Sequence, residues 1–349
     1  MTQSAQPQLN LSGSRLFTTW LASVGGSLVF TTYQAGKVFA IGLDQNGKMS
    51  VYERTFDRPM GLGVGDRQLW LSASYQMWRF SDFFEPGTQS VDGHDAVYVP
   101  TRAHTTGDID VHDVHVRKDG TPLFVVTRFN CLATLAEDSS FTPVWRPPFI
   151  DRIAAEDRCH LNGMAVVDDV PRYATCVGTG NVSESWRDHR RDGGVLIDCQ
   201  SNEIIAQGLS MPHSPRLHNG KLWMLNSGTG EFGVVDRDAG KFEPVSFLPG
   251  FCRGLAFAGN YALIGLSQAR KGGSFDGLAL GERLDAENLT AKCGVCIVNL
   301  ETGDVEHRLE IEGIVDELYD VGFIKGVINP KLVGLKGDEI RMFIKPDHE

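Results

Sequence analysis

The sequence predicts an all-β protein, a seven-bladed β-propeller with four-stranded antiparallel blades, and residues 1–349 form it as a single domain. Three observations favour this fold. Short apolar runs recur with a period of roughly 40 to 50 residues, tight-turn residues separate them, and 39 glycines among 349 residues indicate many turns and few long helices. Six blades plus decoration is the alternative, because radial repetition of either number protects the sheet edges.

The first element of the repeat is a polar phrase between two apolar runs. It reads "TTYQAGKVF" at 31–39 and "SASYQMWRF" at 72–80, and related phrases follow around Asn130, Asn181, Ser227 and Gln268. The phrase marks the turn between the second and third strands of each unit. We therefore expect Gln34 and Gln76 at one rim of the central channel, with each preceding tyrosine buried between blades.

A tight turn between the first and second strands is the second element of the repeat. The seventh unit ends with "EIRMFIKP", which supplies no fourth strand, so we expect residues 9–12 to pair with the strand around Met342 and Phe343 and close the ring. The turn recurs seven times, at Gly25-Gly26, Gly65-Asp66, Asp119-Gly120, Asp168-Asp169, Asn219-Gly220, Gly259-Asn260 and Lys325-Gly326.

Composition excludes several classes of partner. The formal net charge of -11 disfavours phosphate backbones and anionic lipid, so neither nucleic acid nor a membrane is expected as a partner. The chain shows no secretory leader and no bilayer-spanning apolar run, and its seven scattered cysteines do not form a disulfide pattern. We expect a cytoplasmic protein. Its glycine-rich fragments lie at hairpins, so no nucleotide cofactor is expected.

The phrases "TTYQAGKV" (31–38) and "DVHDV" (110–114) resemble an uncharacterised bacterial family of conserved hypothetical, propeller-like proteins. The resemblance covers nearly the whole chain. It implies the propeller fold, and it implies no activity and no site residue.

The longest connections are expected on one face of the ring. In a four-stranded antiparallel blade, the turns between the second and third strands share a face with the crossings between blades. The connections 102–110, 146–162, 180–194 and 267–292 all fall there, and arginines gather in them. Long loops on a rigid scaffold usually carry function. The arginines favour a small anionic molecule or an acidic protein surface as the partner, and local ion pairing explains them equally well.

The candidate site lies where the innermost strands begin, because those positions approach the channel axis. The first unit is expected to begin its innermost strand at Thr18, Thr19 and Trp20. Three consecutive later units place a histidine at the start of this strand: His112, His160 and His213. Asp110 shares a side of its strand with His112 and can orient that ring. Convergent imidazoles suit general acid–base catalysis or a divalent metal ion, for which these three histidines would be the ligands. The substrate-binding residues expected around them are Asn162, Arg216, Arg253, Tyr319, Asp320, Gln34 and Gln76.

Three functions agree with this pattern. The first is an enzyme of the lyase, isomerase or hydrolase class that acts on a small polar or anionic substrate, with or without a divalent metal. The second is a protein-interaction propeller that uses the same face, and the third is a non-catalytic small-molecule sensor. The sequence alone does not decide whether the protein is an enzyme, because a propeller by itself specifies no chemistry.

Overall fold

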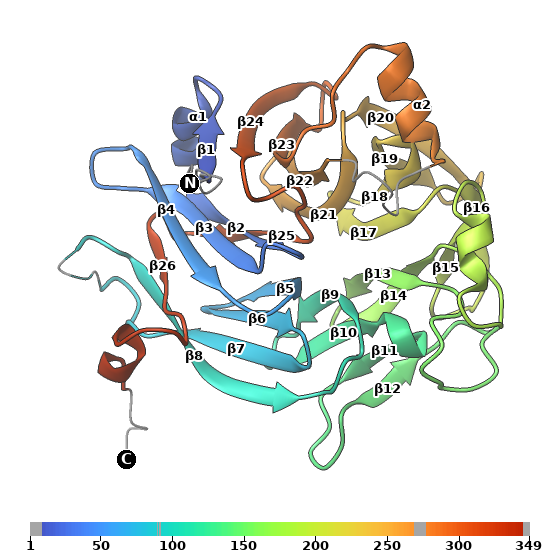
Figure 1. The fold of residues 1–349 in the computed structure, drawn as a ribbon, viewed down its shortest axis with the longest axis horizontal. Coiled ribbons are helices and arrows are strands. Elements are labelled where there is room, and N and C mark those ends of the chain that lie inside the picture. Colours follow the sequence, from blue (N-terminus) through green and yellow to red (C-terminus); the bar gives the residue numbers. More distant parts are fainter. Residues whose placement is uncertain (1–8, 89, 91, 269–276, 345–349) are drawn as a thin grey trace, which may run out of the picture.

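The ring of the propeller contains six blades. A computed structural model describes residues 9–88, 90, 92–268 and 277–344, and their strands form six sheets arranged around a centre (Figure 1). The prediction of seven blades is therefore wrong, and the six-blade alternative is confirmed. Each blade has four antiparallel strands, and two blades carry an additional strand at the outer edge.

The first three blades are built as follows, from the inner to the outer strand. The first contains β25 (Val321–Lys325), β2 (Gly26–Thr32), β3 (Lys37–Leu43) and β4 (Met49–Thr55). The second contains β5 (Pro59–Gly65), β6 (Gln68–Ala73), β7 (Gln76–Asp82), β8 (Ala96–Thr105) and the added strand β26 (Pro330–Leu332). The third contains β9 (Val111–Val116), β10 (Pro122–Val126), β11 (Cys131–Thr134) and β12 (Thr142–Trp145).

The other three blades follow in chain order. The fourth contains β13 (Leu161–Val167), β14 (Val170–Cys176), β15 (Gly194–Asp198) and β16 (Ile204–Leu209). The fifth contains β17 (Pro212–His218), β18 (Lys221–Asn226), β19 (Glu231–Asp236) and β20 (Lys241–Phe247). The sixth contains β21 (Phe251–Ala258), β22 (Tyr261–Ser267), β23 (Gly294–Asn299), β24 (Val305–Glu312) and the added strand β1 (Asn10–Gly13).

The first blade combines β2, β3 and β4 from the start of the chain with β25 from near its end. This arrangement explains why the sequence predicted seven units in place of six. Figure 1 shows β25, coloured red, beside the blue strand β2. Gly26 pairs with Lys325, and the Gly326 amide donates to the Gly25 carbonyl over 2.8 Å. The turns counted at Gly25-Gly26 and at Lys325-Gly326 thus meet at one position in one blade. Counting them as two units gave seven, and the ring is closed by a C-terminal inner strand.

The N-terminal segment does not close the ring as expected. Strand β1 pairs with β24, with Leu11 opposite Ile311, and forms the outer edge of the sixth blade. Met342 ends the 3-10 helix η4 (Glu339–Met342) and so is not part of a strand, and residues 345 and 346 of the expected strand lie outside the described residues.

A helix stands where the first inner strand was expected. Helix α1 (Phe17–Val24) buries Phe17, Trp20 and Leu21. Their spacing of three and four residues is the spacing of one helix face, and these side chains pack into the hydrophobic cluster between the sixth and first blades. Thr18, Thr19 and Trp20 therefore begin no strand, and the expectation that they start the innermost strand of a blade is wrong.

In several blades, a serine or threonine hydroxyl near the end of the second strand forms a hydrogen bond to the neighbouring blade. The hydroxyl donates to a backbone carbonyl at the start of the next inner strand. The donor–acceptor pairs are Thr31–Met60 (2.6 Å), Thr127–Leu161 (2.6 Å), Ser227–Cys252 (2.7 Å) and Ser267–Leu318 (3.0 Å). This hydroxyl precedes the polar turn in each of these four units, and it gives part of the repeated phrase a structural role.

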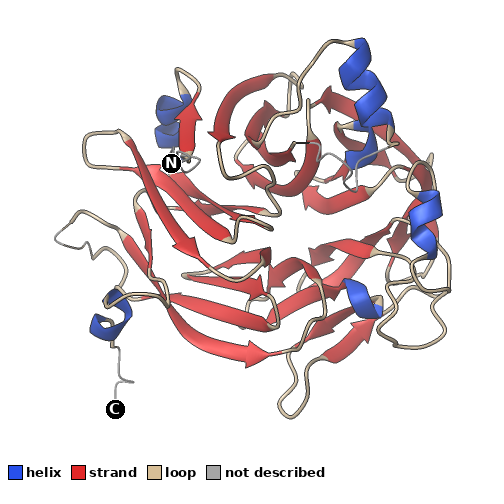
Figure 2. Cartoon of the chain, viewed as in Figure 1, coloured by secondary structure: helices blue, strands red, loops and turns tan. Residues whose placement is uncertain are grey.

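The remaining helices lie in connections between strands (Figure 2). They are α2 (Ala279–Ala286), in the connection 267–292, and the short 3-10 helices η1 (Thr127–Phe129), η2 (Ser185–His189) and η3 (Ser227–Thr229). Residues 269–276 of that connection lie outside the described residues. Within the described ranges, no helix is both long and apolar enough to cross a bilayer.

Candidate functional site

A cavity of about 450 Å³ opens on the face that carries the long connections. Every blade contributes to its wall, chiefly through the crossings that lead into the inner strands. Its floor and sides come from Arg58 and Met60 in the second blade, His112 in the third, His160 in the fourth, Met211 in the fifth, Arg253 in the sixth and Tyr319 at the entry to the first. The volume suits a small molecule.

Four of the six residues that immediately precede an inner strand share a left-handed backbone conformation. Arg58, Asp110, His160 and Met211 each have a φ of +47° to +58° and each immediately precede an inner strand. Asp110 and His160 are therefore equivalent positions, and His112 is equivalent to Asn162 and His213, the second residues of β13 and β17. The three predicted histidines thus occupy two different positions in their blades.

His112 is held with one ring nitrogen occupied. Its Nδ1 lies 2.7 Å from Thr127 Oγ1 and 3.3 Å from the Asp110 carbonyl oxygen. Since the Thr127 hydroxyl already donates its proton to Leu161, the Nδ1–H of His112 must donate to Thr127. Burial lowers the pKa of His112 to about 4, which outweighs the opposite effect of Asp110. The ring is neutral near pH 7, and Nε2 is its unprotonated nitrogen.

His160 forms a dyad with Asp157. Its Nδ1 lies 2.9 Å from Asp157 Oδ2, which also accepts the indole N–H of Trp186 over 3.0 Å. The Trp186 ring stacks on the imidazole with a centroid distance of 4.0 Å. Burial acts to raise the pKa of Asp157, but the attraction and hydrogen bond of His160 and the Trp186 donor lower it overall. Asp157 is thus a carboxylate that orients His160.

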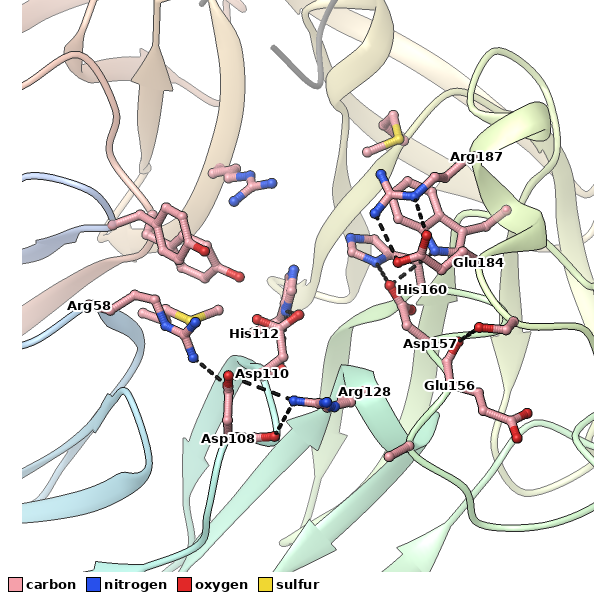
Figure 3. Close-up of a pocket in the computed structure, with 18 of the residues that line it drawn as sticks. Arg58, Asp108, Asp110, His112, Arg128, Glu156, Asp157, His160, Glu184 and Arg187 are labelled. Atoms are coloured by element: carbon pink, nitrogen blue, oxygen red, sulfur yellow. Dashed lines mark hydrogen bonds and ion pairs between the residues drawn. The ribbon is translucent and has the colours of Figure 1, made fainter.

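The rings of His112 and His160 meet edge to face, 5.0 Å apart between centroids. In Figure 3, His112 lies between the Arg58–Asp108 pair and the His160–Asp157 pair. The protein contacts Nδ1 of each ring, so Nε2 is the nitrogen of each ring that can exchange a proton with a bound molecule.

His213 occupies a different environment. It is 3% exposed and does not line the cavity. Its Nδ1 lies 2.8 Å from the Met211 carbonyl, and its Nε2 lies 3.5 Å from Asn162 Nδ2. Asn162 Oδ1 in turn accepts the Thr175 hydroxyl over 2.8 Å. Burial lowers the pKa of His213 well below its ordinary value, so this ring is a neutral structural group.

Arg216 and Asp320 also lie outside the cavity lining, in the centre of the ring. Arg216 binds Asp113 through two bonds of 2.7 and 2.8 Å. Asp320 accepts the backbone amides of Leu62 and Val321 over 2.8 and 2.9 Å. Burial, reinforced by the nearby Asp113, raises the pKa of Asp320 to about 8. Both residues are engaged in joining inner strands.

Arg253 and Tyr319 do line the cavity. The Arg253 guanidinium lies 4.8 Å from the centre of the Tyr319 ring, and that ring lies 5.3 Å from the ring of His112. Burial raises the pKa of Tyr319 well above its ordinary value, so the phenol keeps its proton. Arg253, Tyr319, His112 and His160 therefore form one continuous cluster.

The two predicted glutamines are not part of the lining. Gln34 is exposed, and Gln76 begins β7 opposite Ala73 and Thr105. Of the tyrosines that precede them, Tyr33 lines the cavity and packs 5.7 Å from Tyr319 between ring centroids. Tyr75 is 55% exposed, so the second tyrosine is not buried between blades as expected.

The arginines of this face are mostly paired with carboxylates. Six carboxylate side chains and four arginines line the cavity. Arg58 binds Asp108, and Arg187 binds Glu184 over 3.1 and 3.2 Å. Arg158, only 2% exposed, binds Asp151, Glu156 and Asn181 over 2.6 Å each and joins the connections 146–162 and 180–194. Local ion pairing, the alternative considered above, accounts for these groups.

Sequence reasoning missed Asp157 and Trp186. Asp157 precedes His160 by three residues, and positive φ angles at both residues turn the chain so that their side chains meet. The sequence did show an aspartate three residues before a histidine in the connection between two blades, and this spacing could have identified the pair. Trp186 comes from a separate connection, and its contact with His160 depends on how the two connections pack.

A metal centre is not apparent from the side chains. In the described part of the chain, no group of three or more His, Cys, Asp or Glu side chains is arranged to share a metal ion. The metal expected at His112, His160 and His213 stays a prediction.

Comparison with known proteins places the chain by family and by fold. The model of a family described as a domain of unknown function (DUF4915) matches residues 15–333. No curated protein sequence matches the chain.

Two solved structures share the fold at a TM-score of 0.51. One belongs to a nidogen/laminin complex, is 12% identical, and is matched over 86% of this chain and 99% of that chain. The other is a protein of unknown function from Bacteroides caccae, 11% identical with the same coverage. Virginiamycin B lyase from Staphylococcus aureus has a TM-score of 0.40 and 14% identity over 74% of this chain and 96% of that chain, a likeness too weak to bear on activity.

Proposed function

Because the chain belongs to the DUF4915 family, a family described by its unknown function, we propose its activity from the site itself: an enzyme of the lyase, isomerase or hydrolase class that transfers a proton on a small polar substrate through His160. The observation that carries this proposal is the pair of imidazoles in one cavity, 5.0 Å apart, each with Nδ1 held by the protein.

The two rings differ in ways that suit different tasks. The Asp157 carboxylate on Nδ1 stabilises the positive charge that develops when His160 Nε2 accepts a proton. His112 faces a neutral hydroxyl, and burial keeps it uncharged. A neutral imidazole beside a second imidazole that a carboxylate orients is an arrangement suited to acid–base catalysis.

The proton transfer follows from these roles. His112 Nε2 accepts a hydrogen bond from a hydroxyl or amine of the substrate and fixes its position. His160 Nε2 takes the proton from the reacting atom, and Asp157 stays ionised beside the resulting imidazolium. The His160 Nε2–H can exchange with solvent before His160 gives a proton to the product or to the leaving group, so the enzyme ends each cycle in its starting state.

The test uses proton exchange, which reports the proton transfer itself in any of the three reaction classes. The protein is incubated in deuterated water with a panel of small hydroxy acids, keto acids, esters and lactones, and proton NMR detects deuterium incorporation or new products. His160→Asn keeps a donor toward Asp157 and removes Nε2. We expect it to lower the initial rate by at least about 100-fold.

The matched control is His115→Asn, on the same strand as His112. His115 pairs with Asp169 over 3.5 Å and does not line the cavity, so its replacement should leave the rate unchanged. Turnover in His160→Asn at the wild-type rate contradicts the proposal. Binding without turnover in the wild-type protein favours the non-catalytic sensor instead.

A further inference from the structure

Arg253 differs from the other arginines of the cavity. It is 9% exposed, and its Nε is buried without a partner. Among the residues that the structure describes, its guanidinium makes no hydrogen bond, and it forms a long ion pair with Glu317, whose Oε1 lies 3.8 Å from Nη1. A nearly buried cation without hydrogen bonds is costly unless a ligand supplies them.

The other three arginines of the lining already have acceptors. Arg58 binds the Asp108 carboxylate, Arg128 donates to the Asp108 carbonyl over 3.2 Å, and Arg187 binds Glu184. Among the described residues of the lining, Arg253 is therefore the arginine whose guanidinium makes no hydrogen bond to the protein.

The Arg253 guanidinium packs against two aromatic rings, one of which belongs to the reactive cluster. The guanidinium lies 4.8 Å from the Tyr319 ring centre and 5.5 Å from that of Phe251. The phenol of Tyr319 is buried without a hydrogen-bond partner in the described chain. The planar fork of an arginine matches a planar carboxylate through two parallel hydrogen bonds, which a lysine cannot make.

The charge of the lining narrows the class of anion. Six carboxylates against four arginines repel a multiply charged group such as phosphate. The Arg253 fork, which makes no hydrogen bond to the described protein, can bind one planar anionic group. The site is thus suited to a single planar carboxylate.

We propose that the substrate is a small monocarboxylic acid whose carboxylate binds Arg253 and whose neighbouring hydroxyl or amine faces His112 and His160. Tyr319 bridges the two ends, because its ring contacts both the Arg253 guanidinium and the His112 imidazole. The position of the reacting group beside His160 rests on the proposed function. The binding of the carboxylate by Arg253 does not, since it requires no turnover.

The test measures binding of isotope-labelled glycolate by NMR titration, with glycolamide and inorganic phosphate as comparison ligands. Wild-type protein should bind glycolate at least tenfold more tightly than glycolamide or phosphate. Arg253→Met should weaken glycolate binding at least tenfold, and Arg253→Lys, which keeps the charge in a folded protein, should weaken it severalfold because the planar fork is lost. The control Arg128→Met removes a cavity arginine that already has an acceptor, and it should leave glycolate affinity unchanged.

The outcomes separate this inference from the proposed function. His160→Asn should bind glycolate normally, so loss of turnover with intact binding supports both proposals. Wild-type affinity in both Arg253 variants overturns the carboxylate subsite and leaves the proton-transfer proposal standing. Phosphate binding tighter than glycolate, or an equal loss in Arg128→Met, also overturns the inference, because either result indicates a general cationic pocket.

Discussion

Thr127 joins the fold to the site through one hydroxyl group. Its Oγ1 donates to the Leu161 carbonyl over 2.6 Å and accepts from His112 Nδ1 over 2.7 Å. The substitution Thr127→Val keeps the shape of the side chain and removes both bonds. The Leu161 carbonyl then stays buried without this donor, and His112 keeps only its longer contact of 3.3 Å to the Asp110 carbonyl.

We expect Thr127→Val to lower the free energy of unfolding by about 1–3 kcal/mol, the cost of leaving a buried polar group unsatisfied. The matched control is Thr31→Val. Thr31 is equally buried, donates to the Met60 carbonyl over 2.6 Å and accepts the Asp320 amide over 3.1 Å. Because its hydroxyl contacts no imidazole, Thr31→Val should cost a similar amount of stability and leave His112 unchanged.

Two measurements distinguish the variants. Urea denaturation gives the unfolding free energies, and the nitrogen chemical shifts of isotope-labelled histidine report the tautomer of His112. In Thr127→Val alone, part of the His112 population should move its proton from Nδ1 to Nε2. If both variants lose the same stability and the His112 shifts do not change, then Thr127 does not set the tautomer, and the argument for a free Nε2 is refuted.

Two further predictions concern the ends of the chain and the centre of the ring. A chain that begins at Ser14 loses β1, an outer strand, so urea denaturation should show a folded protein with a modest loss of stability. Deletion of β25, an inner strand, should abolish folding. Equal losses of stability in the two truncated chains would contradict closure of the ring by β25. The pKa of Asp320 is raised from 3.8 to about 8, so between these values the folded state holds more protons and the unfolding free energy should fall as pH rises, by up to about 1.4 kcal/mol per pH unit. Asp320→Asn should flatten that dependence, and an unchanged slope in this variant would count against the assignment.

The sequence predicted the repeat unit and the rim that carries the site, because hairpin turns and apolar runs are local signals. It did not predict the number of blades. Turn chemistry at Gly25-Gly26 and Lys325-Gly326 looks the same whether the two turns belong to two blades or to one. Only the long-range pairing of β2 with β25 decides between these possibilities. The helical spacing of Phe17, Trp20 and Leu21 was visible in the sequence, and it indicated that the first unit lacks its own inner strand.

The sequence predicted which residues begin the inner strands, and it did not predict the directions in which their side chains point. Counting from the strand starts identified His112, Arg253 and Tyr319, which the structure brings together. The same counting treated His160 and His213 as equivalent, although one precedes its strand and the other lies within it. A left-handed residue at four of the six inner-strand entries changes the direction of the next side chains, and outside glycine this backbone conformation is uncommon and only enriched in asparagine, aspartate and histidine.

Closure of the ring and completion of the site depend on the same segment. Tyr319 directly precedes the pair Asp320–Val321 that leads into β25, and its amide donates to the Thr31 carbonyl over 2.8 Å. Tyr319 therefore reaches Arg253 in the sixth blade and His112 in the third only when β25 has joined β2. A ligand held by Arg253 and His112 contacts blades on both sides of this junction, so its binding energy must favour the closed ring. The cavity is thus built at the seam of the propeller, where the contacts that close the ring also place Tyr319 beside Arg253 and His112.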